Sequence, residues 1–155
     1  MDLELVEMRY DHSVAQELTH EVQAEYGRLY GGEGDSSPVD PEQFTPPQGF
    51  FVLALLGGEP VGMGGWRRGG PAEGDAEIKR MYVRAQRRRS GVGRRILAEL
   101  ERTAYDAGVA RLVLETGMAQ PDAIALYRAA GFVDIPAFGH YASSPGAVHL
   151  GRVLR

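Results

Sequence analysis

The 155-residue sequence contains no cysteine, and this absence excludes several kinds of site at once. Without a thiol the chain has no disulfide framework, no thiolate metal site and no acyl-cysteine intermediate. Its histidines, His12, His20, His140 and His149, show no spacing typical of metal ligands. We therefore expect a protein without a bound metal.

Long apolar runs are also lacking. None approaches the roughly 20 residues that span a bilayer. The first ten residues mix acidic residues and Arg9 with apolar ones, unlike a signal peptide. We expect a cytoplasmic protein without a membrane partner. A composition of 43% hydrophobic and 25% charged residues fits a single globular domain over residues 1–155.

Basic residues are scarce in the N-terminal third, where only Arg9 and Arg28 oppose eleven acidic residues between Met1 and Gly49. Residues 79–95, in contrast, carry eight basic residues and no acidic one. This segment is a candidate for anion binding, and the plain alternative is a solvated helix start. A net charge of −4 and arginines concentrated at one turn argue against nucleic acid as the partner.

Apolar spacing predicts alternating strands and helices. The expected order is an edge strand near Leu3, a helix from about Ser13 to Leu29, a proline-rich loop to Gly49, strands over 50–56, 61–66 and 76–83, a helix from Gly91, a strand over 111–115, a helix from Pro121, and strands over 132–141 and 148–154. This order predicts a mixed α/β (α+β) fold.

One segment carries the clearest chemistry: Arg88-Arg89-Ser90-Gly91-Val92-Gly93, at the junction of a strand and a helix. Its two glycines let a ligand approach the backbone, and a helix N-terminus favours an anion. A Walker A loop needs a longer glycine spacing that ends in Gly-Lys-Ser/Thr, and a dinucleotide motif needs a third glycine where Ile96 stands. These features suit a pyrophosphate, but the segment matches neither of these two nucleotide-binding motifs.

This segment resembles motif A of the GNAT superfamily of N-acetyltransferases, Gln/Arg-x-x-Gly-x-Gly/Ala, with Arg88, Gly91 and Gly93 at the fixed positions. Its surroundings agree, because residues 76–83 resemble the family's fourth strand and residues 123–132 its motif B. The resemblance covers roughly residues 52–154. It implies a mixed, mostly antiparallel sheet of six to seven strands flanked by about four helices.

The resemblance also implies acetyl-CoA as co-substrate and assigns residues to it. Backbone groups of the fourth strand would pair with the pantetheine arm, and the Met81 amide would polarise the acetyl carbonyl. The cofactor-binding residues by this resemblance are Met81, Tyr82, Val83, Arg88, Arg89, Ser90, Gly91, Val92, Gly93, Arg94 and Tyr127.

Two residues inherit catalytic roles from the resemblance. Tyr127 would donate a proton to the departing thiolate, and Glu77 would take the proton of the ammonium, directly or through a water. The plain alternatives are a core tyrosine on the inner face of a helix and a salt-bridged glutamate in a strand. Gln120 stands where many members have asparagine, and Ser90 is free either to bond a phosphate or to cap the helix.

The acceptor is less defined. Acidic residues from Glu17 to Glu42 lie on elements that flank the acceptor entrance in this family, which favours a cationic amine of a small molecule or peptide. His140-Tyr141, Trp66 and Tyr30 are candidates for acceptor contacts, although a tryptophan is more often core. Many relatives are homodimers, so a homodimer is expected by resemblance. The competing function is a catalytically degenerate module that binds acetyl-CoA without turnover.

Overall fold

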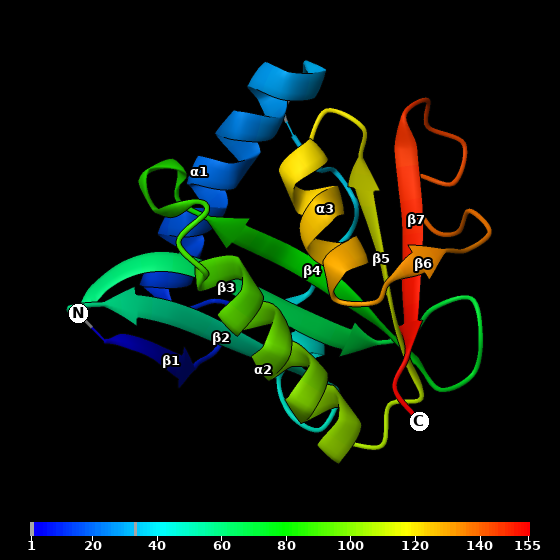
Figure 1. The fold of residues 1–155 in the computed structure, drawn as a ribbon, viewed down its shortest axis with the longest axis horizontal. Coiled ribbons are helices and arrows are strands. Elements are labelled where there is room, and N and C mark those ends of the chain that lie inside the picture. The colour runs from blue at the N-terminus through cyan, green and yellow to red at the C-terminus, as the bar shows by residue number, and fades with distance from the viewer. Residues whose placement is uncertain (1, 33) are drawn as a thin grey trace.

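The protein folds around one seven-stranded sheet (Figure 1), as the computed structural model describes for residues 2–32 and 34–155. The strands follow the spatial order β1-β2-β3-β4-β5-β7-β6. Their bounds are β1 Leu3–Glu7, β2 Gly49–Leu56, β3 Glu59–Arg68, β4 Asp75–Val83, β5 Arg111–Gly117, β6 Val133–Asp134 and β7 Ala147–Val153. Only β4 and β5 pair in parallel; the other neighbours are antiparallel.

Helices cover both faces of this sheet. They are α1 (Ser13–Tyr30), α2 (Val92–Asp106) and α3 (Pro121–Ala129), with short 3-10 turns at Pro41–Phe44 and Ala85–Arg87. The expected mixed, mostly antiparallel fold is confirmed. Within the described residues, three α-helices and two 3-10 turns stand in place of about four helices.

Two hydrophobic cores, one on each face, hold the layers together. Ile96, Leu97 and Leu100 of α2 pack with one set of strand residues, whereas Leu18 and Val22 of α1 pack with the other set. β2 contributes alternate residues to both cores, which is why its sequence reads as a continuous apolar run. In Figure 1, α2 and α3 lie in front of the sheet, and α1 covers the opposite face.

The middle of the sheet opens because β4 and β5 pair over only three residues each, Asp75–Glu77 with Arg111–Val113. Beyond Glu77 the two strands diverge. A register shift in the β3 pairing lies opposite Arg80, whose φ is +58°. The shift changes which residues face which core, so that Ile78 and Met81 both lie on the α2 face.

The predicted strand over 132–141 is wrong beyond its first residues, because β6 contains only Val133–Asp134. Pro136 has no N–H to donate to a ladder, and Gly139 has a φ of +75°. The chain instead forms a loop that brings His140 and Tyr141 back toward the centre of the molecule.

Candidate active site

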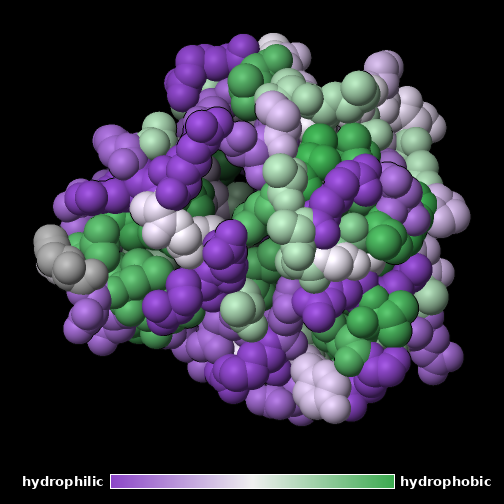
Figure 2. Space-filling view, viewed as in Figure 1, coloured by the Kyte–Doolittle hydropathy of each residue, from purple (hydrophilic) through white to green (hydrophobic). Residues whose placement is uncertain are grey.

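A large cleft of about 1270 Å³ occupies the place where β4 and β5 diverge. Its walls come from the C-terminal half of α1, β4, the turn before α2, β5, α3 and the loop before β7. Figure 2 shows it as a hollow between the surfaces of α1 and α3. The cleft is therefore lined by residues of α1 and of α3, which flank the gap between β4 and β5.

One end of the cleft is formed by the glycine turn. α2 begins at Val92, and Gly91 precedes it with a φ of +90°. The first N–H groups of a helix lack intrahelical partners, and no side chain caps those of α2 at this end of the cleft. A Cβ at Gly93 would lie 3.2 Å from Leu126 of α3, which narrows the space on that side. The turn thus has the open backbone donors that an anionic group requires.

Arg88, predicted to contact pyrophosphate, is held by protein groups. Its guanidinium donates to both carboxylate oxygens of Glu25 at 2.8 Å and to the Val83 carbonyl at 2.9 Å. It also lies 5.7 Å from the centre of the Tyr82 ring. These contacts join the turn to α1, so in this structure Arg88 positions the turn.

The other polar residues of the turn behave differently. The Arg89 side chain is 83% exposed, 3.4 Å from Asp122 of α3, and Arg94 is exposed. The Ser90 hydroxyl donates to the Arg87 carbonyl rather than capping α2. Two arginine side chains beside the glycine turn are therefore accessible to a ligand.

The β4 backbone forms the floor of this end. Residues 78–83 have no ladder partner on the β5 side among the described residues, so their backbone groups line the gap. The side chains of Met81 and Val83 pack against the core under α2, and Tyr82 belongs to the core under α1. The stretch predicted to pair with pantetheine is thus an open strand edge in the cleft.

Tyr127 lies at the centre of the cleft and is only 5% exposed. Its ring packs edge-on against Phe132 at a centroid distance of 5.6 Å. Burial raises the pKa of the Tyr127 hydroxyl well above its usual value, and the nearby Tyr26 and Glu115 act in the same direction. The phenol keeps its proton at neutral pH and makes no hydrogen bond within the described residues.

Glu77, the predicted base, does not line this cleft. Its Oε1 accepts bonds from the Arg67 guanidinium at 3.1 and 3.3 Å, and its Oε2 lies 4.0 Å from Lys79 Nζ. These surroundings are those of the alternative considered from the sequence, a salt-bridged glutamate.

A second carboxylate, Glu115 of β5, does line the cleft, and sequence reasoning missed it. Burial raises the pKa of Glu115 to about 7, against the lowering effect of Lys79 and with a further increase from Asp35 and Glu77. It makes no hydrogen bond or ion pair with the described part of the chain. An acidic residue near the end of a short buried strand was the available signal.

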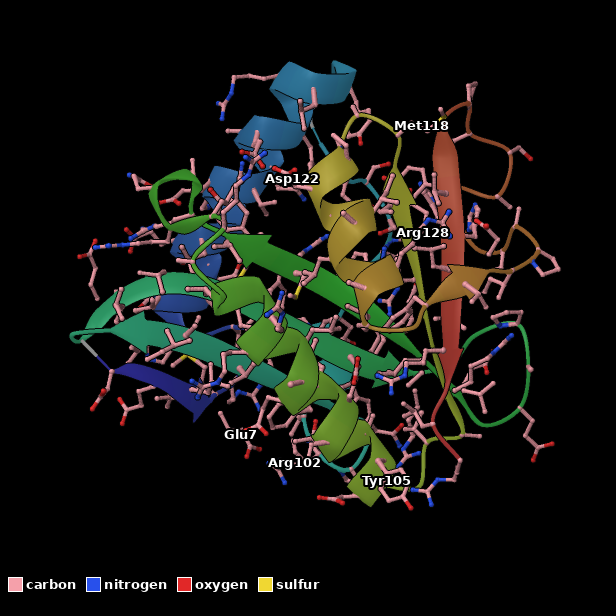
Figure 3. All side chains as sticks on the ribbon, viewed as in Figure 1. Glu7, Arg102, Tyr105, Met118, Asp122 and Arg128 are labelled. Carbon is pink, nitrogen blue, oxygen red and sulfur yellow. The ribbon has the colours of Figure 1, made fainter. Side chains whose placement is uncertain are left out.

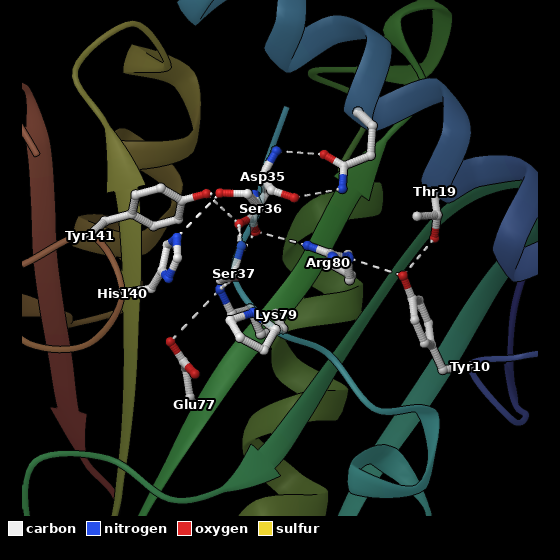
Figure 4. A network of polar contacts seen from close by, with 12 residues as sticks. Tyr10, Thr19, Asp35, Ser36, Ser37, Glu77, Lys79, Arg80, His140 and Tyr141 are labelled. Atoms are coloured by element: carbon white, nitrogen blue, oxygen red, sulfur yellow. Dashed lines mark hydrogen bonds and ion pairs between the residues drawn. The ribbon is translucent and has the colours of Figure 1, made fainter. Parts of the chain in front are cut away.

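Asp35, which also lines the cleft, organises a network of polar contacts (Figure 4). Its carboxylate accepts bonds from the Tyr141 hydroxyl at 2.6 Å, the Ser37 hydroxyl at 2.7 Å and Arg80 at 2.8 Å, and lies 3.5 Å from Lys79 Nζ. Burial opposes ionisation of Asp35, but the charge of Lys79 and the hydrogen bonds outweigh it and lower its pKa. Asp35 therefore stays ionised throughout the neutral range.

The same network joins two distant loops. The Ser36 N–H donates to the Tyr141 oxygen at 2.8 Å, and the Ser36 hydroxyl lies 3.2 Å from His140 Nε2. We call Asp35, Ser36, His140 and Tyr141 the Asp35 clasp. Of the candidates for acceptor contacts, Tyr141 and Tyr30 line the cleft and His140 does not, whereas Trp66 is a core residue bonded to Thr103.

The acidic residues of the N-terminal third are largely paired. Arg84 lies 3.5 Å from Glu17 and 2.6 Å from Glu21, and Glu25 holds Arg88. These glutamates follow one another at intervals of four residues along α1, so they present one charged stripe to the basic segment. The stripe pairs with Arg84 and Arg88 of the basic segment rather than forming a free acidic surface.

Two further features concern the described residues as a whole. No group of three or more metal-ligating side chains is found among them. No helix in residues 2–32 or 34–155 has the length and apolar character to cross a membrane.

Solved structures share this fold. A provisionally assigned acyl-CoA N-acyltransferase from Klebsiella pneumoniae subsp. pneumoniae MGH 78578 superposes with a TM-score of 0.82 at 27% identity, over 99% of this chain and 98% of that one. The PaiA N-acetyltransferase from Thermoplasma acidophilum, in complex with coenzyme A, gives a TM-score of 0.71 at 16% identity, over 99% of each chain. The fold is therefore that of acyl-CoA-dependent acyltransferases.

Sequence comparison gives the family. A family model described as "Acetyltransferase (GNAT) family" matches residues 15–132. An "IAA acetyltransferase" of Azospirillum brasilense is 35% identical over 138 residues, 89% of each chain. The chain belongs to the GNAT family of acetyltransferases, whose members use acetyl-CoA, and it is an acyltransferase.

Proposed function

We propose that the protein transfers an acetyl group from acetyl-CoA to a primary amine of a small molecule or peptide, by direct attack in a ternary complex. One observation carries this proposal: a single cleft holds an open anion-binding turn at one end and the Glu115 carboxylate beside the Tyr127 phenol farther in. The first group suits a pyrophosphate, and the pair suits proton transfer.

The donor half of the site would hold acetyl-CoA. The N–H groups from Gly91 to Arg94 would bind the pyrophosphate, with Arg89 and Arg94 adding charge-assisted bonds. The open edge of β4 would pair with the pantetheine arm, as a strand edge does with an extended partner. The coenzyme A bound by the Thermoplasma acidophilum protein supports this proposal through the shared fold.

The chemistry follows from the remaining groups. An ammonium must lose a proton before its nitrogen attacks the thioester carbonyl, and a carboxylate with a pKa of about 7 suits that task at neutral pH. The Met81 amide would stabilise the developing oxyanion. When the carbon–sulfur bond breaks, Tyr127 would give its proton to the thiolate.

Two glutamates compete for the role of base. Glu77 remains a proposal only through a water relay, because Arg67 holds its carboxylate. Glu115 lines the cleft and has no such partner, so we favour it. Replacing each separately by glutamine distinguishes them, since only the base should control the pH dependence of turnover.

Release of the CoA thiol from acetyl-CoA, measured with a panel of amines, tests the proposal. IAA, after which the Azospirillum brasilense relative is named, is tested alongside the amines. Amine-dependent thiol release together with an acetylated product is the expected result. Tight acetyl-CoA binding without release on any acceptor would favour the alternative, a degenerate binding module. A homodimer and a cytoplasmic location stay predictions.

A further inference from the structure

The acceptor half of the cleft is lined by apolar and aromatic side chains. Tyr26, Leu29 and Tyr30 of α1 line one wall, and Tyr141 lines the other. The rings of Tyr26 and Tyr30 meet edge-on at 6.3 Å. Asp35 lines the same cleft and accepts a bond from Tyr141. A ligand bound beside these side chains would contact aromatic rings and a leucine.

Tyr30 is held in place at the entrance. Its hydroxyl accepts a bond from Gln120 Nε2 at 3.0 Å, and it lies 2.0 Å from where a Cβ at Gly117 would be. The glycine therefore provides the space that the Tyr30 ring occupies. Leu29 and Tyr30 are nevertheless 44% and 49% exposed, and Met118, next to Gly117, is 69% exposed. Apolar surface is thus displayed around the entrance.

The charged side chains of this half would bind one ammonium, because one carboxylate in the described part of the cleft is unpaired. Asp35 is bonded to Arg80 and lies near Lys79, and Glu25 is bonded to Arg88. Among the described residues that line the cleft, Glu115 is the carboxylate without such a partner. Among the other charged residues that line the cleft in the described part of the chain, Asp122 lies 3.4 Å from Arg89, and Arg28 is exposed and repels a second cation.

We propose that the acceptor is a monoamine with an apolar substituent the size of an aromatic ring. The amino group would reach Glu115, and the substituent would pack against Tyr26, Leu29 and Tyr30. A polyamine would place a second ammonium among rings and charges that are paired with one another in the described part of the chain, so its lost hydration would not be compensated. This inference rests on the proposed function and names its substrate class.

The test compares kcat/KM for 2-phenylethylamine, ethylamine, 1,4-diaminobutane and phenylalanine, with acetyl-CoA as donor. We expect 2-phenylethylamine to exceed each of the others by about tenfold or more. A higher value for the diamine, for ethylamine or for phenylalanine would overturn the proposal, because each requires a different acceptor pocket.

A matched pair of variants localises the effect. Tyr30→Ser should lower kcat/KM for 2-phenylethylamine about tenfold and change that for ethylamine little. Tyr105→Ser is the control, because Tyr105 is also 49% exposed but lies at the far end of α2 from Met118 and the cleft (Figure 3). Equal losses on both amines, or from both variants, would contradict an apolar acceptor wall at Tyr30.

Binding separates this inference from the proposed function. Calorimetry in the presence of CoA compares N-acetyl-2-phenylethylamine with N-acetylated 1,4-diaminobutane. We expect the aromatic amide to bind about tenfold more tightly, even if no acceptor releases thiol, in which case the proposed function alone fails. Tighter binding of the charged amide would refute the substrate class whether or not turnover is seen.

Discussion

The two halves of the cleft are built in different ways. The donor half comes from one continuous stretch, in which β4 leads through the glycine turn into α2, and its binding groups are mainly backbone N–H groups. The acceptor half brings together α1, the Asp35 loop, β5 and the loop at Tyr141, and its groups are side chains. A local motif can therefore define the donor half, whereas the acceptor half exists only in the folded chain.

The largest expected effect concerns the acceptor half. Asp35→Asn removes the carboxylate that compensates Arg80 and Lys79, whose side chains are only 7% and 8% exposed. Leaving such charges uncompensated should cost about 3 kcal/mol of the free energy of unfolding. Denaturant unfolding measures this loss.

The control for this variant is Asp134→Asn. Asp134 pairs with Arg128 on the surface, where its side chain is 73% exposed, so its loss should change stability little. Any properly folded Asp35→Asn protein should keep its affinity for acetyl-CoA, because the clasp does not touch the glycine turn. Equal stability losses from the two variants would show that Asp35, Lys79 and Arg80 do not form a buried charge network.

The second largest effect concerns Tyr127, between the donor and acceptor halves of the cleft. Tyr127→Phe removes the proposed proton donor and keeps the ring that packs on Phe132. We expect kcat to fall about 100-fold with little change in the Kd of acetyl-CoA, because the hydroxyl acts on the departing thiolate. Steady-state kinetics and equilibrium binding check the two quantities. Parallel losses of both would mean that Tyr127 only shapes the pocket.

A smaller effect tests the donor half alone. Gly91→Ala places a Cβ on a residue with a φ of +90°, which should cost about 1 kcal/mol of stability and weaken acetyl-CoA binding. Gly58→Ala is the matched control: its φ is +83° and it also has open space around it, in the β2–β3 hairpin. It should lose similar stability without changing the Kd. Weakened binding in both variants would refute a specific role for the turn.

Much of the fold could be predicted from periodicity and turn residues. The predicted first helix, Ser13 to Leu29, differs from α1 by one residue, and the strands over 50–56 and 61–66 and the helix after Gly91 are confirmed. Residues 135–141 could not be assigned correctly, because their apolar and aromatic residues resemble a strand. The Tyr141 side chain instead donates to Asp35, more than a hundred residues away in the sequence.

The candidate site, like the fold, could be predicted from the sequence only in part. The glycine turn and Tyr127 lie in local motifs, and the structure places both in the cleft. Ion pairing could not be read from the sequence: Glu77 is held by Arg67, and the α1 glutamates pair with the basic segment. For the same reason Glu115 was missed, since only folding shows that it lines the cleft unpaired.

The central claim, that Glu115 is the base, is tested most directly by the pH dependence of kcat/KM in Glu115→Gln. The acceptor should be an alkylamine, because its own ionisation falls at higher pH. In the wild type, we expect kcat/KM to rise with pH through about 7 as Glu115 ionises. Glu115→Gln should lose this rise and fall about 100-fold at pH 8, while Glu77→Gln keeps it.

The pH dependence of stability provides an independent test of the same residue. Because the pKa of Glu115 is raised in the folded state, from 4.5 to about 7, its contribution to stability is present below pH 4.5 and lost as pH rises through 7. Glu115→Gln should therefore be more stable than the wild type at pH 8. A wild-type pH profile in a folded Glu115→Gln protein would contradict the account, and loss of the rise in Glu77→Gln alone would assign the base to Glu77.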